Sequence, residues 1–190
     1  MTTVIAVGEP GSVADDEHEI AIRADTATAG RARRARPGRS AILRPMADEP
    51  LSETEQRRRR EAIKAIFPQT PFMGLLDIGF DRYEPDDVVV RLPFHEQLTN
   101  DGEVYHGGVI ATMLDTAGAA AAWSNHDFDK GARASTVSLS VQYVGAARRS
   151  DLLCHGRAVR RGRELIFCEV TATDEDGRLV AHGLQTYRIV

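Results

Sequence analysis

One acidic side chain interrupts the most apolar stretch of this 190-residue sequence. Asp115 lies among alanines and aliphatic residues that run from Val109 to Trp123. An ionised carboxylate inside such a helix costs several kcal/mol unless it is hydrogen-bonded, paired or open to water. Asp115 also lies about two turns beyond Gly108, too far along to cap the helix start. We therefore interpret it as a functional base in preference to a structural core aspartate.

The residues just before this stretch complete a set of groups suited to acyl chemistry. His106, Gly107 and Gly108 open the helix, where unpaired backbone N–H groups and the positive end of the helix dipole favour a developing oxyanion. Asn100, on the N-terminal side of His106, could polarise a carbonyl. A loop histidine followed by a glycine turn would have the same sequence, so His-Gly-Gly alone is not specific. It indicates a site only together with Asp115. The combination predicts a carbonyl polariser, oxyanion donors and a base.

Helical spacing places a candidate binding face next to these groups. Gly108, Thr112 and Asp115 share one side of the expected helix, and Ala119 and Ala122 continue that side with little bulk. We expect this face to line a slot in which Gly108 and Thr112 contact the substrate. The larger side chains that could bound an acyl group there are Met73, Phe94 and Trp123.

The segments before the apolar helix are predicted to form a helix and two strands. Ser52 and Glu55 have the spacing of a capping box, so a helix is expected over residues 52–67, where two prolines end it. Its run of arginines is expected on the solvated side. Apolar alternation then predicts strands over residues 75–83 and 87–92.

The C-terminal third of the chain alternates apolar and polar residues in the manner of strands. A two-residue turn is expected at Arg161-Gly162. The expected strands cover residues 134–143, 151–160, 164–173 and 179–189. The order of helix, two strands, buried helix and four strands predicts an α+β fold. In it, a long curved antiparallel sheet wraps around one central helix and is preceded by a short helix.

Asn100 and the run Tyr-His-Gly-Gly-Val-Ile-Ala-Thr-Met-Leu-Asp that ends at Asp115 resemble the hotdog-fold acyl-CoA thioesterases of the phenylacetic-acid-pathway (PaaI-like) type. The resemblance covers residues 75–190 and implies the hotdog fold and hydrolysis of acyl-CoA to a free acid and coenzyme A. It implies that Asp115 activates water or attacks the thioester, and that the Gly107 N–H binds the thioester oxygen. Asn100 and His106 would then orient and polarise the substrate.

The same resemblance implies a hydroxyl residue on the strand after the helix, facing the aspartate of a partner subunit. Thr136 is the expected residue, with Ser138 as the alternative. Relatives often carry Arg-Pro-Ala after the tyrosine of this strand, whereas this chain continues Val-Gly-Ala-Ala-Arg-Arg, so the resemblance does not fix the coenzyme A contacts. Because coenzyme A carries phosphates, we expect a basic rim beside the pocket. The arginines that could form it, each of which could equally be a solvated turn residue, are Arg148, Arg149, Arg160, Arg161 and Arg163.

Composition excludes several classes of protein. The 28 acidic and 24 basic side chains give a formal net charge of -4, which argues against a body that neutralises nucleic-acid phosphates. Cys154 and Cys168 form no CxxC pair, so we expect no disulfide framework, no metal site and a reducing, cytoplasmic location. A turn at Arg161-Gly162 would pair the adjacent strands so that Cys154 and Cys168 point to opposite faces of the sheet. We therefore expect that the two thiols do not face each other. No apolar run reaches the roughly 18 residues of a membrane span, so no membrane insertion is expected. No cofactor is expected, because coenzyme A is part of the substrate.

The first fifty residues differ in composition from the rest. All aromatic residues lie between Phe67 and Tyr187, whereas half of the eight prolines and two blocks of like charge precede residue 51. Such a segment lacks the apolar surface for a core, so residues 1–50 are expected to be a disordered leader and residues 51–190 the folded domain. A natural start at Met46, with the leader as an extension, is an alternative.

Three functions fit these observations. Thioester hydrolysis is favoured, because Asn100, His106 and Asp115 are all present. An enoyl-CoA hydratase-like hotdog enzyme would share the fold. A non-catalytic acyl-CoA sensor, with an arginine-rich leader that contacts nucleic acid, is the third. An open antiparallel sheet leaves an edge for a partner strand, so we expect a homodimer or a dimer of dimers, a homotetramer.

Overall fold

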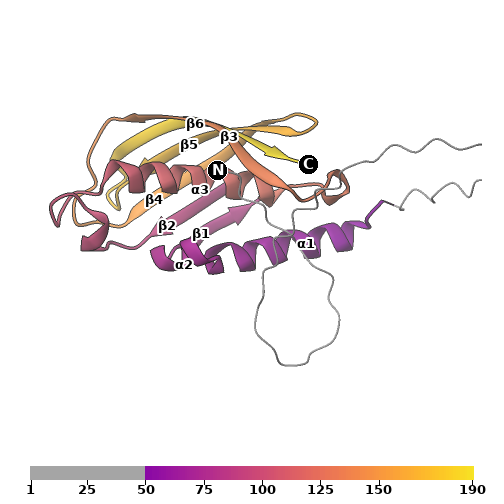
Figure 1. Ribbon diagram of the computed structural model, residues 1–190, viewed down its shortest axis with the longest axis horizontal. Helices are drawn as coiled ribbons and strands as arrows, with labels where there is room; N and C mark the ends of the chain where they lie inside the picture. The colour runs from indigo at the N-terminus through magenta and orange to yellow at the C-terminus, as the bar shows by residue number, and fades with distance from the viewer. Residues whose placement is uncertain (1–49) are drawn as a thin grey trace, which may run out of the picture. The chain divides into compact units, whose positions relative to one another are not determined.

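The computed structural model describes residues 50–190, and the predicted leader lies outside the described residues apart from Pro50 (Figure 1). No helix in this part of the chain is long and apolar enough to cross a membrane. The elements are, in chain order, α1 Glu53–Ile66, η1 Phe67–Gln69, α2 Pro71–Leu76, β1 Gly79–Glu84, β2 Asp87–Leu92, η2 Glu96–Leu98, α3 Gly107–Ser124, η3 Phe128–Lys130, β3 Ala134–Tyr143, β4 Leu152–Arg161, β5 Leu165–Thr173 and β6 Leu179–Ile189.

The strands form one antiparallel sheet that curves around α3 (Figure 1). Their order is β1-β2-β4-β5-β6-β3, so β1 and β3 are the edges. Alanines and glycines let the helix approach closely: a Cβ on Gly156 of β4 would overlap the Ala117 carbonyl of α3. Most of α3 from Met113 onward is buried, as its apolar composition predicts. The predicted hotdog fold, with its single central helix and a preceding short helix, is confirmed.

The first helix begins where the sequence predicts, although only half of its capping box forms. Ser52 Oγ accepts a hydrogen bond from the Glu55 N–H at 3.3 Å, while the Glu55 carboxylate accepts one from Arg59 Nε at 2.9 Å. The buried Gln56 then fastens α1 to η3, because its Oε1 accepts a hydrogen bond from the Phe128 N–H. This helical layer is therefore held to the segment that follows α3 by a specific polar contact.

The strand predicted over residues 75–83 is wrong in its first half. Residues Pro71–Leu76 form the helix α2, and the strand is confined to Gly79–Glu84. Pro71 stands in the first turn, where its missing N–H is tolerated, and Asp77 ends the helix in the left-handed region with a φ of 52°. The correction matters because α2 forms part of the site described below.

The hairpin predicted at Arg161-Gly162 is also displaced. β4 continues through Arg161, which lies opposite Ile166, and the Gly162 N–H donates to the Leu165 carbonyl at 2.7 Å. The turn therefore lies two positions later than predicted, at Arg163-Glu164, and a register shift between Ala158 and Arg160, further along the hairpin, changes the parity of the pairing.

The two cysteines lie on the same face of the sheet, so the prediction that they point to opposite faces is wrong. Cys154 lies opposite Ala172, four residues along β5 from Cys168, and both thiols are free and buried. They do not meet because they are offset along the strands. Burial raises the pKa of Cys168 to about 12 and that of Cys154 still further, so both stay protonated near neutral pH.

Candidate functional site

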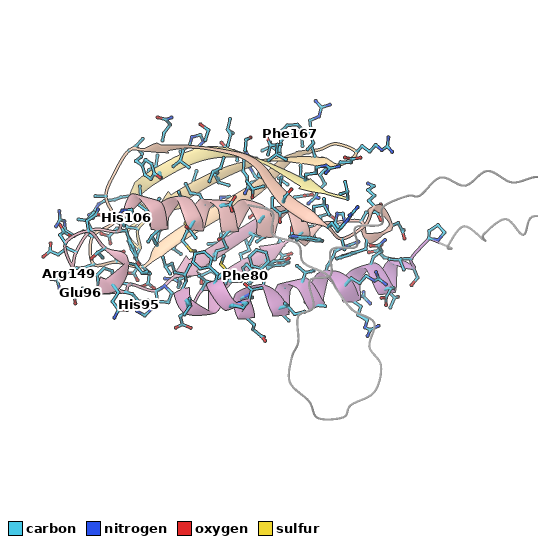
Figure 2. The ribbon with its side chains drawn as sticks, viewed as in Figure 1. Phe80, His95, Glu96, His106, Arg149 and Phe167 are labelled. Atoms are coloured by element: carbon cyan, nitrogen blue, oxygen red, sulfur yellow. The ribbon has the colours of Figure 1, made fainter. Side chains whose placement is uncertain are left out.

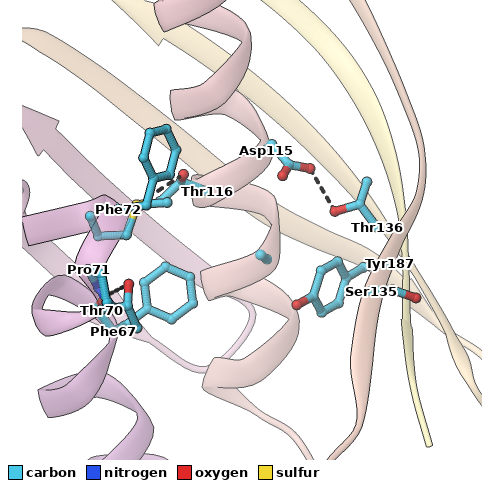
Figure 3. Close-up of a pocket in the computed structure, with 11 residues that line it drawn as sticks. Phe67, Thr70, Pro71, Phe72, Asp115, Thr116, Ser135, Thr136 and Tyr187 are labelled. Carbon is cyan, nitrogen blue, oxygen red and sulfur yellow. Dashed lines mark hydrogen bonds between the residues drawn. The ribbon is translucent and has the colours of Figure 1, made fainter. Parts of the chain in front are cut away.

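Asp115 stands on the wall of a cavity of about 400 Å³ between α3, the α2 region and β3 (Figure 3). The carboxylate is half-buried. The remaining wall is largely aromatic and aliphatic. The lining residues are Phe67, Thr70, Pro71, Phe72, Met73, Thr116, Ala119, Ser135, Thr136 and Tyr187. A carboxylate beside a mainly apolar cavity is the arrangement expected of a functional base.

Two side chains from different strands donate hydrogen bonds to Asp115. Thr136 Oγ1 of β3 donates to Oδ1 at 2.7 Å. Gln185 Nε2 of β6 donates to the same Oδ1 at 2.6 Å and to the Asp115 backbone carbonyl at 2.9 Å. Both partners present donors, which suits an ionised carboxylate, and they offset the cost of removing it from water.

A bulge in β3 turns Thr136 toward Asp115. The register between β3 and β6 shifts between Thr136 and Ser138, so that Thr136 lies opposite Tyr187 and Leu139 lies opposite Gln185. Strict alternation predicts Thr136 on the side away from Leu139, and the bulge reverses this. Ser138, the alternative hydroxyl, lies beyond the bulge on the other face of the strand.

The structure also corrects the predicted partner of Thr136. Its hydroxyl contacts Asp115 of its own chain, whereas the resemblance implied the aspartate of a partner subunit. Thr136 and Asp115 are therefore brought together by folding alone.

The start of α3 has one occupied and one open N–H group. His106 is the N-cap residue, and its Nδ1 accepts a hydrogen bond from the Gly108 N–H at 2.9 Å. The Gly107 N–H donates to no acceptor among residues 50–190. Tyr143 OH donates to the Gly107 carbonyl at 3.0 Å and packs beside this glycine. The N–H of Gly107 therefore has no acceptor within the described residues, whereas the N–H of Gly108 is taken by the cap; that Gly107 binds an oxyanion stays a prediction.

The start of α3 is distant from Asp115 within one chain. Asp115 lies eight positions after Gly107 along the helix, a rise of about 12 Å. Thr112, between them, uses its hydroxyl to donate to the Gly108 carbonyl at 2.9 Å. Asn100 is exposed in the loop before α3. The structure thus joins Asp115 with Thr136, whereas no hydrogen bond within residues 50–190 joins Asn100 or Gly107 to either residue.

The predicted basic rim divides between the two ends of α3. Arg148 and Arg149 lie beside the helix start, where both form ion pairs with Glu103. Figure 2 shows Arg149 at the same end of the fold as His106. Arg161 and Arg163 lie at the β4–β5 hairpin instead, next to the C-terminal end of the helix.

Arg161 is engaged in structural contacts. Its Nη1 and Nη2 donate to the Ala122 and Ala121 carbonyls, each at 3.0 Å, and its Nε donates to Asp86 at 2.6 Å. It satisfies carbonyls at the end of α3 that have no helical partner. Arg161 is therefore not a free cation for phosphate, whereas Arg163 is exposed.

Of the side chains expected to bound the acyl slot, only Met73 lines the cavity. Trp123 is buried behind the wall and donates from Nε1 to Tyr187 OH at 3.3 Å. Phe94 packs edge-on against Tyr105, away from the cavity lining. Burial raises the pKa of Tyr187 to about 12, so its phenol is neutral at physiological pH.

Sequence reasoning missed Gln185 and Tyr187, and also most of the cavity wall: Phe67, Thr70, Pro71, Phe72, Thr116 and Ser135. The buried face of β6 otherwise carries Ala181, Gly183 and Ile189, and a glutamine in that phase is the signal that could have identified Gln185. Among residues 50–190, no three histidine, cysteine or acidic side chains are grouped to hold a metal ion.

Comparison with known proteins places this site in context. The family model described as the thioesterase superfamily matches residues 102–181, which include α3 and most of the sheet. A protein of Halobacterium salinarum, provisionally named an esterase, is 31% identical over 127 residues, 62% of this chain and 83% of that protein. Human acyl-coenzyme A thioesterase 13 is 28% identical over 130 residues, 67% of this chain and 91% of that protein.

Solved structures agree with these sequence relatives. Zebrafish thioesterase superfamily member 2 superposes with a TM-score of 0.58 at 30% identity, covering 68% of this chain and 97% of that chain. A Streptococcus mutans protein bound to acetyl-CoA gives a TM-score of 0.53 at 25% identity, covering 60% of this chain and 88% of that chain.

Proposed function

Because the chain belongs to the thioesterase superfamily, we propose that it hydrolyses acyl-CoA thioesters to a free carboxylic acid and coenzyme A. Membership supports thioester hydrolysis in general. Coenzyme A as the carrier is supported by the likeness to human acyl-coenzyme A thioesterase 13 and to the acetyl-CoA-bound Streptococcus mutans protein. The proposal covers the PaaI-like subtype, and the acyl group is left to the experiment below.

The observation that carries this proposal is the Asp115 carboxylate on the wall of a largely apolar cavity. An acyl group would lie against the aromatic lining, with its thioester carbonyl at Asp115. The carboxylate would then activate a water molecule or attack the carbonyl directly. Either route places negative charge on the thioester oxygen, which requires a hydrogen-bond donor such as the open N–H of Gly107.

The helix geometry leads us to propose that two copies of the chain build each active site. A carbonyl cannot lie within about 3 Å of both Asp115 and a Gly107 that is about 12 Å further along the same helix. A second copy could supply Asn100, His106 and Gly107 to the first copy's Asp115. The edge strand β3 carries Thr136, and its outer side pairs with no strand of residues 50–190, so we propose a homodimer or a dimer of dimers.

Mixing two inactive variants tests the shared site. Asp115→Asn and Asn100→Ala would each inactivate their own homodimers. Half of the dimers formed on random exchange are mixed, and one of their two sites is intact, so the mixture should recover about a quarter of wild-type turnover. No recovery after confirmed subunit exchange would contradict a shared site, as would an active monomer in light scattering.

A panel of acyl-CoAs tests the activity itself. Free thiol released from acetyl-, hexanoyl-, palmitoyl- and phenylacetyl-CoA is followed with a thiol dye, with Asp115→Asn as the matched control. We expect release that depends on Asp115, and the preferred acyl group then identifies the subtype. Binding without release would support the acyl-CoA sensor. Hydration of an enoyl-CoA without thiol release would support the hydratase.

A further inference from the structure

Gln185 is a buried polar residue in the middle of the sheet. Only 2% of its surface is exposed, and it lies on β6 between Cys168 of β5 and Leu139 of β3. Strand pairing on both sides fixes its backbone. Its side chain reaches α3, where Nε2 donates to Asp115 Oδ1 at 2.6 Å and to the Asp115 carbonyl at 2.9 Å. One amide group therefore holds both the carboxylate and the backbone of Asp115.

The orientation of this amide is determined by its neighbours. Rotation by half a turn would place Oε1 against the two oxygens of Asp115, which are both acceptors while the carboxylate is ionised. In the observed orientation, Oε1 is buried and has no hydrogen-bond partner within the described residues. An unpaired buried oxygen is unfavourable, so an apolar residue would serve packing better at this position.

The helix leaves space for the amide. A Cβ on Gly118, one turn after Asp115, would overlap Gln185 Oε1 and come within 2.8 Å of its Cδ. A glycine in the interior of α3 lowers helix propensity, and here its absent side chain admits Gln185. The unpaired oxygen and the glycine are each unfavourable for stability. Both occur where Gln185 contacts Asp115.

We propose that Gln185 is a positioning residue that selects which oxygen of Asp115 reacts. Thr136 and Gln185 donate to the same atom, Oδ1, from two different strands. Oδ2 accepts no hydrogen bond from residues 50–190 and is the oxygen left to meet water or the thioester. Two donors on Oδ1 and the contact to the Asp115 carbonyl together prevent rotation of the carboxylate. This inference rests on the proposed function, since it concerns the same reaction.

Gln185→Met tests the proposal, because methionine matches glutamine in length and lacks the donor. We expect kcat to fall about 10- to 100-fold through misplacement of the carboxylate. KM should stay within about twofold, because Gln185 touches Asp115 and not the cavity. The melting temperature should fall by no more than a few degrees, since the lost hydrogen bonds to Asp115 are partly offset by removal of the unpaired Oε1. Leu184→Met, at the exposed neighbouring position, is the matched control and should leave kcat unchanged. Wild-type kcat in Gln185→Met would overturn the proposal.

Gln185→Glu is a second test, which stays decisive if Gln185→Met folds poorly, because glutamate has nearly the same shape as glutamine. The introduced carboxyl can donate only while protonated, and two facing carboxyls share one proton. Its kcat should therefore be recovered toward acid pH and lost as the pH rises, unlike that of the wild type. A pH profile identical to wild type would contradict the proposal.

A measurement without turnover separates this inference from the proposed function. In protein labelled with ¹³C at aspartate carboxyls, the Asp115 signal is assigned by its loss in Asp115→Asn. It should shift in Gln185→Met and not in Leu184→Met. If the wild type hydrolyses no thioester but this shift is found, the proposed function fails while the contact stands. An unchanged signal would overturn the positioning role.

Discussion

The two ends of α3 differ in how their backbone groups are satisfied. At the C-terminal end, Arg161 donates to two carbonyls and is itself held by Asp86. At the N-terminal end, the Gly107 N–H has no acceptor among the described residues, and the cap residue His106 is exposed. A helix end whose carbonyls are bonded by a distant side chain serves the fold, whereas an unbonded N–H at the positive end of the dipole is available to a ligand.

This contrast separates residues that the sequence grouped together. Arg161 and Arg163 carry the same charge and lie two positions apart, and both were predicted to bind substrate. The contacts of their side chains distinguish them: Arg161 bonds to carbonyls of α3 and to Asp86, whereas Arg163 is exposed. Asp115, between the two ends, shares features of both: Oδ1 is bonded, and Oδ2 has no hydrogen-bond partner within residues 50–190.

The largest effect is expected at Asp115. Asp115→Asn should lower turnover about 10²- to 10⁴-fold if the carboxylate acts as general base. The amide oxygen can still accept from Thr136 and Gln185, so stability should be equal or higher. Turnover, affinity for a non-hydrolysable acyl-CoA analogue and thermal unfolding are measured on one preparation. Near-normal turnover with a lower melting temperature would show that Asp115 has a structural role, like that of Arg161 at the C-terminal end of α3.

Arg161→Met should mainly affect stability. Loss of the charge-assisted bonds to the helix carbonyls and to Asp86 should lower the free energy of unfolding by roughly 2–3 kcal/mol, a value limited by their partial exposure. Denaturant unfolding measures this, with KM for acyl-CoA determined in parallel. Arg163→Met is the matched control and should change stability by less than about 0.5 kcal/mol. A raised KM with unchanged stability in Arg161→Met would return this residue to the substrate site.

Gly118→Ala should disturb the contact between Gln185 and Asp115 in the middle of α3, although Gly118 does not line the cavity. The new methyl group would displace the Gln185 amide, so turnover should fall about tenfold if that amide positions Asp115. In a Gln185→Ala background, where the amide is gone and Val170 Cγ1 at 3.0 Å is the close neighbour that remains, the same change should have little further effect on turnover. Additive losses in this double-mutant cycle would show that the two residues act independently.

The smallest effect is expected at the N-terminal end of α3, where the cap residue His106 lies. His106→Ala removes the side-chain cap on the Gly108 N–H and should cost about 1 kcal/mol of stability. His95→Ala is the matched control, because His95 precedes η2 without a side-chain cap bond. Thermal unfolding of both variants compares them. Equal losses would mean that the cap at the start of α3 contributes nothing specific.

Most elements of this fold follow from local patterns in the sequence, although α2 does not. An apolar run after a histidine and two glycines predicts α3, and alternation predicts β2 with its bounds, Asp87–Leu92. These patterns succeed because helix and strand periodicities depend on residues only a few positions apart. The candidate carboxylate was identified for the same reason, since a charge within an apolar helix is visible without any long-range contact.

Contacts between distant segments were decided by the tertiary structure. Gln185 lies 70 residues from Asp115, and nothing local to β6 indicates that its amide faces the carboxylate. A single bulge moves Thr136 to the inner face of β3, and another register shift precedes Arg161 where β4 meets the helix end. Because strand side chains alternate with a period of two, one inserted residue changes the face of every residue on one side of it. The sequence by itself thus determined which helix carries the carboxylate, and strand register, set by packing around that helix, decided which side chains hold it.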